Sequence, residues 1–237
     1  MSSRGVRRIR TGIEKLDEML FGGIPRGDIV LLSGGPGTGK TVLATQFIYN
    51  GARLYGESGV YVTFTESAES FESDMRTLGW DLRPFIEEGK LAILDMLAPK
   101  SGMLDEVLNL ILEKVEETGA ERLVIDSVTA MLMSLKERVD VRTVLITLQR
   151  FLRKLGCTSI LVVETPWGER KIGFGVEEFI ADGIIMLEMI AEVPSMIRRI
   201  AILKMRGTKI DERFYRFEIA EGKGIVISSY PESFSKR

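Results

Sequence analysis

The 237-residue sequence has no histidine and only one cysteine, Cys157, and each shortage excludes a class of chemistry. Without histidine, imidazole proton relays, histidine-activated nucleophiles and most zinc sites are excluded. A general base must therefore be a carboxylate or a lysine, and a metal must be held by oxygen ligands. Cys157 precedes an apolar run, and we interpret it as a small core residue in a reducing compartment.

Long apolar runs are also missing. No run approaches the roughly 20 apolar residues that span a bilayer, and no apolar segment follows the basic residues 1–10. We therefore expect a cytoplasmic protein without a membrane partner. The net charge of −2 and the 45% hydrophobic content predict a single globular domain over residues 1–237. Residues 1–10 are expected to be a solvated tail rather than a nucleic-acid arm, and residues 228–237 a flexible tail.

Short apolar runs alternate with segments of helical period, which is typical of an α/β fold. Strands are expected at residues 28–33, 59–64, 91–95, 122–126 and 158–164, and helices at 40–54, 68–78, 103–117 and 141–155. The end of the chain has no long helix. Its apolar runs, at 183–189, 198–205, 214–219 and 224–227, predict antiparallel strands that extend a mainly parallel sheet flanked by helices.

Residues 34–41 fit the phosphate-binding pattern G-x-x-x-x-G-K-[ST], and they lie between an expected strand and an expected helix. Glycines let backbone amides approach phosphate, and the helix start adds unpaired N–H groups. Lys40 would meet the β- and γ-phosphates, while the Thr41 hydroxyl would bind Mg²⁺. We call this segment the P-loop, with the binding residues Gly34, Gly35, Pro36, Gly37, Thr38, Gly39, Lys40 and Thr41.

Two carboxylates follow expected strands, at the edge where open α/β sheets bind ligands. Asp126 fits a role in holding Mg²⁺, directly or through water, and the alternative is that it caps the next helix. Glu66 follows the strand at 59–64. If that strand neighbours the P-loop strand, Glu66 faces the γ-phosphate and polarises the attacking water. The alternative is a carboxylate at a helix start, with Thr65 or Ser67 as the cap.

Two cations, Lys204 and Arg206, come at the end of an expected strand. Period-two alternation puts both on one face, after Ile200 and Ile202. The pattern is compatible with a clamp for an anion and also with an ordinary solvated strand end.

Together these segments resemble the KaiC-type branch of the RecA superfamily, and the likeness covers nearly the whole chain. Outside the P-loop it is carried by TGIEKLDEML at 11–20, GGIPRG at 22–27, FTES at 64–67, LGWDL at 78–82, IDS at 125–127, GVEEFIAD at 175–182 and KMRGT at 204–208. The resemblance implies a RecA-like P-loop NTPase fold. It also implies ATP as substrate, Mg²⁺ as cofactor and a homohexameric ring with nucleotide between subunits.

The resemblance further assigns roles to individual residues. Glu66 matches the second of two adjacent catalytic glutamates of KaiC, whereas Thr65 stands in place of the first. Lys204 and Arg206 match residues that reach the γ-phosphate bound by the neighbouring subunit, so they would act in trans. Further nucleotide contacts are implied for Val42, Met205, Gly207 and Thr208.

The resemblance also bears on autokinase activity. The second KaiC domain phosphorylates itself on a serine and a threonine in the segment that matches residues 176–182. This chain has Glu177 and Glu178 there. A carboxylate cannot accept the phosphoryl group as a hydroxyl ester, so we expect an ATPase without autokinase activity at this site.

Two other functions stay open. Recombinases and helicases of the superfamily contact DNA through loops that match residues 134–140 and 166–174, and the second loop interleaves Trp167 and Phe174 with cations. Acidic residues in these loops, the slightly negative net charge and the missing DNA-binding domain weigh against a DNA-stimulated ATPase. With Thr65 in place of a carboxylate, the chain would alternatively be a nucleotide-gated assembly module with negligible turnover.

Overall fold

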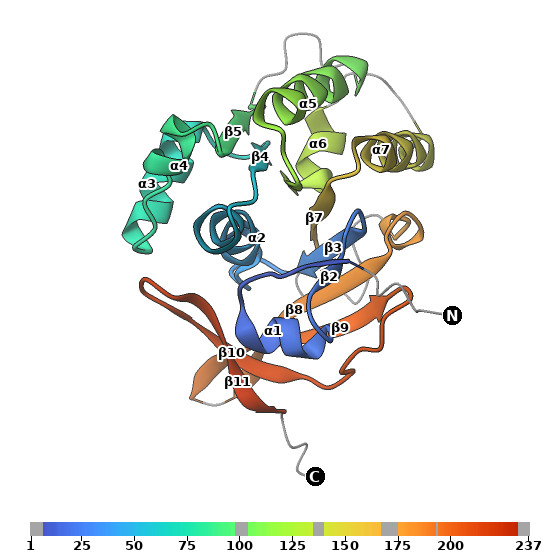
Figure 1. The fold of residues 1–237 in the computed structure, drawn as a ribbon. Helices are drawn as coiled ribbons and strands as arrows, with labels where there is room; N and C mark the ends of the chain where they lie inside the picture. The colour runs from blue at the N-terminus through green and yellow to red at the C-terminus, as the bar shows by residue number, and fades with distance from the viewer. Residues whose placement is uncertain (1–6, 98–103, 135–139, 167–174, 193, 232–237) are drawn as a thin grey trace, which may run out of the picture.

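A computed structural model describes residues 7–97, 104–134, 140–166, 175–192 and 194–231. The strands of its main sheet are β3 (Ile29–Gly34), β4 (Gly59–Thr63), β5 (Leu91–Asp95), β6 (Arg122–Asp126), β7 (Thr158–Glu164), β8 (Gly183–Glu192), β9 (Ser195–Met205), β10 (Tyr215–Ala220) and β11 (Gly224–Pro231). They form one sheet in the order β11-β10-β9-β8-β3-β7-β6-β4-β5 (Figure 1).

The sheet changes direction at β8. From β5 to β8 all neighbouring strands are parallel, whereas β8 to β11 pair antiparallel. This confirms the expected class, a mainly parallel sheet with antiparallel C-terminal strands. One detail differs, because β8 was expected among the antiparallel strands and instead runs parallel to β3.

The helices are α1 (Glu14–Met19), α2 (Lys40–Asn50), α3 (Ala68–Thr77), α4 (Arg83–Glu87), α5 (Leu104–Thr118), α6 (Val128–Ser134) and α7 (Val141–Leu155). A π-helical turn, η1 (Gly51–Tyr55), extends α2, and η2 (Glu177–Phe179) is a 3₁₀ turn. The expected helices are present, whereas α1, α4 and α6 span too few residues to show a helical period. Among the described residues, no helix has both the length and the apolar character to cross a membrane.

Helices cover both faces of the sheet and enclose two apolar clusters (Figure 1). One cluster lies under α5, α6 and α7, and the other under α1, α2 and α3, where it continues onto β9 to β11. The apolar side of α7 shows why it packs: Val144, Leu145, Leu148 and Leu152 are all buried. Asp140 caps this helix by accepting the Thr143 N–H at 3.2 Å.

Cys157 lies in the cluster under α5, α6 and α7, as the sequence predicts. Its side chain is buried, and its Sγ lies 3.0 Å from the carbonyl oxygen of Ala120. Burial raises the pKa of the Cys157 thiol to about 11. The thiol is therefore protonated near neutral pH, which suits a core residue rather than a nucleophile.

The N-terminal segment corrects the expectation of a solvated tail over residues 1–10. Strand β1 (Arg8–Ile9) pairs with β2 (Ile24–Pro25), and Ile9 has no exposed surface. The Arg8 guanidinium donates a hydrogen bond to the carbonyl oxygen of Gly23 at 2.9 Å. Ile9, an apolar residue among basic neighbours, is buried in the core although the sequence pattern did not indicate it. Residues 1–6 lie outside the described part of the chain.

The expected flexible segment at residues 228–237 also belongs partly to the sheet. Strand β11 continues to Pro231, which pairs with Tyr215 of β10. This end of β11 is polar and exposed, as an edge strand can be, so hydropathy did not reveal it. Residues 232–237 lie outside the described ranges.

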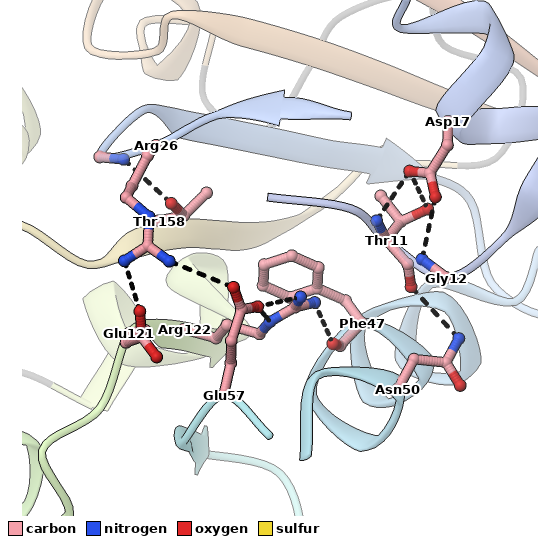
Figure 2. Close-up of polar contacts among 11 residues, drawn as sticks. Thr11, Gly12, Asp17, Arg26, Phe47, Asn50, Glu57, Glu121, Arg122 and Thr158 are labelled. Carbon is pink, nitrogen blue, oxygen red and sulfur yellow. Dashed lines mark hydrogen bonds and ion pairs between the residues drawn. The ribbon is translucent and has the colours of Figure 1, made fainter. Parts of the chain in front are cut away.

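The segment at 11–20, which carries part of the resemblance to KaiC, has a structural role (Figure 2). The Asp17 carboxylate accepts hydrogen bonds from the Thr11 N–H at 2.7 Å, the Thr11 hydroxyl at 2.8 Å and the Gly12 N–H at 3.1 Å. Asn50, at the end of α2, donates to the Thr11 carbonyl at 3.2 Å. These contacts fasten the start of the chain to the helix that follows the P-loop.

A fully buried arginine holds the start of β6 (Figure 2). Arg122 donates to Glu57 at 2.8 Å and to the carbonyl oxygen of Phe47 at 2.7 Å, and its guanidinium lies 4.6 Å from the centre of the Phe47 ring. Glu57 also pairs with Arg26, which contacts Glu121. The buried charge is therefore fully paired, as its burial requires.

Candidate active site

The P-loop joins β3 to α2 with a backbone that glycine favours. Gly37 and Gly39 have φ angles of 72° and 99°, in the left-handed region where a side chain is strained. Gly39 occupies the N-cap position of α2, and no side chain caps this helix. The first N–H groups of α2 are therefore free of a competing side-chain acceptor and suited to an anion.

Lys40 lies over the P-loop and is held by a neutral group. Its ammonium donates to the carbonyl oxygen of Gly35 at 2.9 Å, and the Thr38 hydroxyl donates to the same oxygen at 2.8 Å. Burial lowers the pKa of Lys40, while the carboxylates of Glu164 and Asp126 oppose that shift. A phosphate oxygen would be a stronger acceptor for this cation than the carbonyl is.

Asp126 contacts the P-loop helix directly. Its Oδ2 atom accepts hydrogen bonds from the Thr41 hydroxyl at 2.8 Å and from the Tyr61 hydroxyl at 2.6 Å. The alternative role of Asp126 as a helix cap is wrong, because the Ser127 hydroxyl caps α6 by accepting the Ala130 N–H at 3.1 Å. The carboxylate is therefore directed at the P-loop, as the metal-binding hypothesis requires.

The donor set of Thr41 and Asp126 fits Mg²⁺. A hydroxyl and a carboxylate are hard oxygen donors, and Mg²⁺ is commonly held by one or two such groups together with phosphate and water. Within the described ranges, no group of three or more His, Cys, Asp or Glu side chains is placed to hold a metal by itself. A metal at this position would therefore need phosphate oxygens and water to complete its coordination.

The sheet order corrects the route by which Glu66 was expected to reach the nucleotide. The strand before Glu66, β4, does not neighbour the P-loop strand, because β7 and β6 lie between β4 and β3. It neighbours β6 instead, and Thr63 of β4 pairs with Asp126. Glu66 therefore follows a strand that ends beside Asp126, at the same edge of the sheet as the P-loop.

The Glu66 carboxyl lies near other acidic side chains, and its pKa reflects their charges. Burial raises its pKa, the charges of Asp74 and Asp126 raise it further, and a hydrogen bond with Ser70 opposes them. The Ser67 hydroxyl accepts the Ser70 N–H at 3.2 Å and so caps α3. The capping alternative is thus correct for Ser67, and it leaves the Glu66 carboxylate outside the cap.

A β-bulge overturns the expected alternation before Lys204. Lys204 pairs with Ile184 and Ile202 pairs with Ile185, so Leu203 has no partner on β8. Because adjacent residues of β8 point to opposite faces, Lys204 and Ile202 do as well. The expectation that Ile200 and Ile202 share the face of Lys204 is therefore wrong.

Lys204 and Arg206 lie at the edge of the sheet opposite to the P-loop. The Lys204 ammonium donates to the Ala181 carbonyl at 2.7 Å, and the Arg206 guanidinium lies 3.7 Å from the Asp182 carboxylate. Asp182 in turn bonds to Ile29, the first residue of β3, whereas the P-loop follows its last. The six residues of β3 span about 20 Å at roughly 3.3 Å per residue.

The four further residues implied for nucleotide binding have different settings. Val42 is half-buried in the first turn of α2, beside the P-loop. The Met205 side chain is buried in the core, so only its backbone can face a ligand. Gly207 has a φ of 62° in the turn after β9. The Thr208 hydroxyl accepts a hydrogen bond from Arg8 at 3.0 Å.

Two residues at the P-loop were missed by the sequence analysis. Glu164 ends β7, pairs with Gly34 and acts on the charge of Lys40. It ends a buried strand as Asp126 does, so the same argument could have found it. Arg198 of β9 donates to the carbonyl oxygen of Gly37 at 3.1 Å. Nothing in its local sequence indicated this contact.

A cavity of about 430 Å³ lies beside the P-loop. It is lined by Pro36, Lys40, Thr129, Met133, Glu164, Thr165 and Pro166. Pro166, the first residue of one loop considered for nucleic-acid contact, lines this cavity. Residues 135–139 and 167–174 of the two loops lie outside the described part of the chain, so DNA contact stays a prediction.

Comparisons with known proteins find KaiC-like proteins over nearly the whole chain. A family model described as "ATPase: KaiC" matches residues 9–232. A UPF0273 protein of Thermotoga maritima is 40% identical over 95% of this chain and 97% of its own length. The circadian clock oscillator protein KaiC of Thermosynechococcus vestitus is 37% identical over 94% of this chain but only 45% of its own length. A crystal structure of a KaiC-like protein from Pyrococcus horikoshii, 42% identical, superposes with a TM-score of 0.87 and covers 95% of this chain and 100% of that one.

Proposed function

Since the chain belongs to the KaiC family of ATPases, we propose that it binds Mg-ATP and hydrolyses it at sites shared by neighbouring subunits of a homohexameric ring. The observation that carries this proposal is the 2.8 Å hydrogen bond between Thr41 and Asp126, next to a P-loop whose helix has no side-chain cap. It brings a hydroxyl, a carboxylate and the Lys40 cation to one edge of the sheet.

The P-loop residues divide the binding of ATP among them. The unpaired N–H groups at the start of α2 bind phosphate oxygens, and Lys40 exchanges the Gly35 carbonyl for the β- and γ-phosphates. Thr41 would hold Mg²⁺ directly and Asp126 partly through water. The bound ion supplies positive charge against the phosphates. After hydrolysis, the product ADP is released from these same contacts.

Glu66 is the proposed water-positioning carboxylate. Its segment follows the strand that pairs with Asp126, and burial raises its pKa, which makes it a better proton acceptor than an ordinary exposed glutamate. Thr65 next to it carries no charge. We therefore propose one carboxylate per site and a slow turnover.

Lys204 and Arg206 are proposed to act on the nucleotide of the neighbouring subunit. About 20 Å of strand separates them from the P-loop of their own chain. A head-to-tail contact between copies would bring the edge with Arg206 against the edge with the P-loop. Such a contact closes into a ring when its rotation closes.

We propose no autokinase activity for this chain. Glu177 is fully buried, and the Glu178 carbonyl accepts a hydrogen bond from Lys204 at 3.3 Å, so this turn positions a cation. Its two carboxylates offer no hydroxyl at the positions phosphorylated in the second KaiC domain. The cytoplasmic location expected from the sequence remains part of the proposal.

The shared site is tested by mixing inactive variants. Lys40→Ala and Glu66→Gln each damage the P-loop side, and Arg206→Ala damages the opposite side. Each variant alone should release little phosphate from Mg-ATP. A mixture of Arg206→Ala with Lys40→Ala should regain activity, because some interfaces then join an intact P-loop to an intact Arg206. A mixture of Lys40→Ala with Glu66→Gln is the matched control and should stay inactive, since both defects lie on the same side.

The same measurement separates the alternatives. Full activity of Arg206→Ala as a monomer would contradict the shared site. Wild-type protein that binds ATP, changes its mass in light scattering and releases no phosphate would be a nucleotide-gated assembly module. Turnover that rises on addition of single-stranded DNA would favour the nucleic-acid-stimulated ATPase.

A further inference from the structure

We propose that Tyr61 is a positioning residue of the metal site, whose hydroxyl fixes the Asp126 carboxylate in the orientation that Mg²⁺ requires. This inference rests on the proposed function, since it concerns the same nucleotide site. Tyr61 would contact neither ATP nor the metal. Its action would pass entirely through Asp126.

The geometry singles out one oxygen of the carboxylate. Tyr61 lies on β4, beside β6, and its hydroxyl donates to Oδ2 of Asp126 at 2.6 Å. The Thr41 hydroxyl donates to the same atom at 2.8 Å. No described residue donates a hydrogen bond to the other oxygen, Oδ1. Two donors on one oxygen fix the rotation of the carboxylate, and Oδ1 would remain to accept from a ligand outside the chain.

The Tyr61 phenol is a buried donor. The side chain is 2% exposed, and its O–H is directed at the Asp126 carboxylate. Hydrogen bonds from a hydroxyl to an ionised carboxylate are short and about twice as strong as neutral ones.

The aromatic ring of Tyr61 is also held in place, by packing against another ring. Its centre lies 4.3 Å from that of Phe71, which is itself 1% exposed on α3. A ring packed in this way loses little further freedom when its hydroxyl bonds, so the donor is preorganised. Phenylalanine would fill the same space without donating. Packing alone therefore does not explain why this residue is a tyrosine rather than a phenylalanine.

The test removes only this hydroxyl. Tyr61→Phe and wild type are compared for ATP binding as a function of Mg²⁺ concentration, and for ATP binding in EDTA. We expect the variant to need about tenfold more Mg²⁺, the lower range for losing a hydrogen bond to a charged group. Binding in EDTA should not change, because the P-loop and Lys40 are intact.

Tyr215→Phe is the matched control. Tyr215 is also buried and donates to a carboxylate, Asp211, at 2.7 Å, but it is the first residue of β10, where it pairs with Ile200, and its hydroxyl bonds to no residue of the proposed metal site. It should lower the unfolding temperature as Tyr61→Phe does and leave the Mg²⁺ dependence at the wild-type value. A wild-type Mg²⁺ dependence in Tyr61→Phe, or an equal shift in both variants, would overturn the inference alone. Wild-type protein without Mg²⁺-dependent ATP binding would overturn the proposed function as well.

Discussion

Asp126 and Asp182 are both almost fully buried, with 7% and 4% of their surfaces exposed, but they lie at opposite edges of the sheet and have different partners. Asp126 accepts hydrogen bonds from two neutral hydroxyls, and no described cation forms an ion pair with it. Asp182 accepts two hydrogen bonds from Arg153 at 2.5 and 2.6 Å and one from the Ile29 N–H at 2.9 Å.

The difference shows how a protein prepares one carboxylate for a cation from outside. A buried carboxylate that already pairs with a guanidinium has its charge balanced within the fold, and its role is structural. A buried carboxylate that has only hydroxyl donors has no counter-ion in the fold, so an external cation gains more by binding there. Asp126 is of the second kind and Asp182 of the first.

The largest expected effect comes from removing the charge of Asp126. Asp126→Asn keeps the size of the side chain and an acceptor oxygen for Thr41 and Tyr61. We expect phosphate release from Mg-ATP to fall by about 100-fold or more, as when other preorganised electrostatic groups are removed. The unfolding temperature should stay the same or rise, because a buried charge without a cation is costly. Phosphate-release assays and thermal unfolding measure the two effects.

Asp182→Asn should show the reverse pattern. It leaves the Arg153 guanidinium without its carboxylate and weakens the link between Arg206 and the start of β3. We expect the free energy of unfolding to fall by about 1–3 kcal/mol, since the bonds lost are to a charged group but Arg153 is partly in water. Urea unfolding measures this, and ATP binding to the P-loop should be retained. Loss of ATP binding with unchanged stability would contradict the division of roles.

A smaller effect is expected at Asp28, whose carboxyl is influenced by the charge of Asp182. Burial and the charge of Asp182 raise the pKa of Asp28 to about 6, against the opposing pull of Arg153, Arg8 and Arg206. A raised pKa means that the folded state binds the proton more tightly than the unfolded state does. The stabilisation is thus complete below the unfolded pKa and is lost as the pH rises through about 6.

Asp28→Asn should therefore be more stable than wild type at pH 8, by less than about 1 kcal/mol because water screens a half-exposed group. The difference should shrink as the pH falls through 6 and vanish below about pH 4, where both states of the wild type are protonated. Urea unfolding at pH 4, 6 and 8 measures it. A difference of the same size at all three values would mean that the charge of Asp28 is not its cause.

Local patterns predicted much of the fold and the core of the site. Residues 34–41 could be recognised from their own sequence. Glycines, a lysine and a hydroxyl in one short loop form a phosphate site when a strand precedes them and a helix follows. The same holds for Asp126 at the end of a buried strand. In both cases the information lies within about ten residues, and the class of sheet followed from the alternation of elements.

Contacts between distant segments were harder to predict. The sequence gives no strand order, so it left open whether the strand before Glu66 neighbours β3, and the structure places two strands between them. The bulge at Leu203 depends on how β9 pairs with β8, and it changed the face of Lys204. The contact between Arg198 and Gly37 joins residues 161 positions apart.

The amino-acid sequence by itself determined that this protein has a P-loop, an α/β sheet and acids at the strand ends, because each of these is a local pattern of residue types. Only the tertiary structure decided which of those acids meets Thr41, which tyrosine supports it, and that Lys204 and Arg206 lie across the sheet from the P-loop of their own chain. These depend on strand order and register, which are set by packing between segments far apart in the sequence.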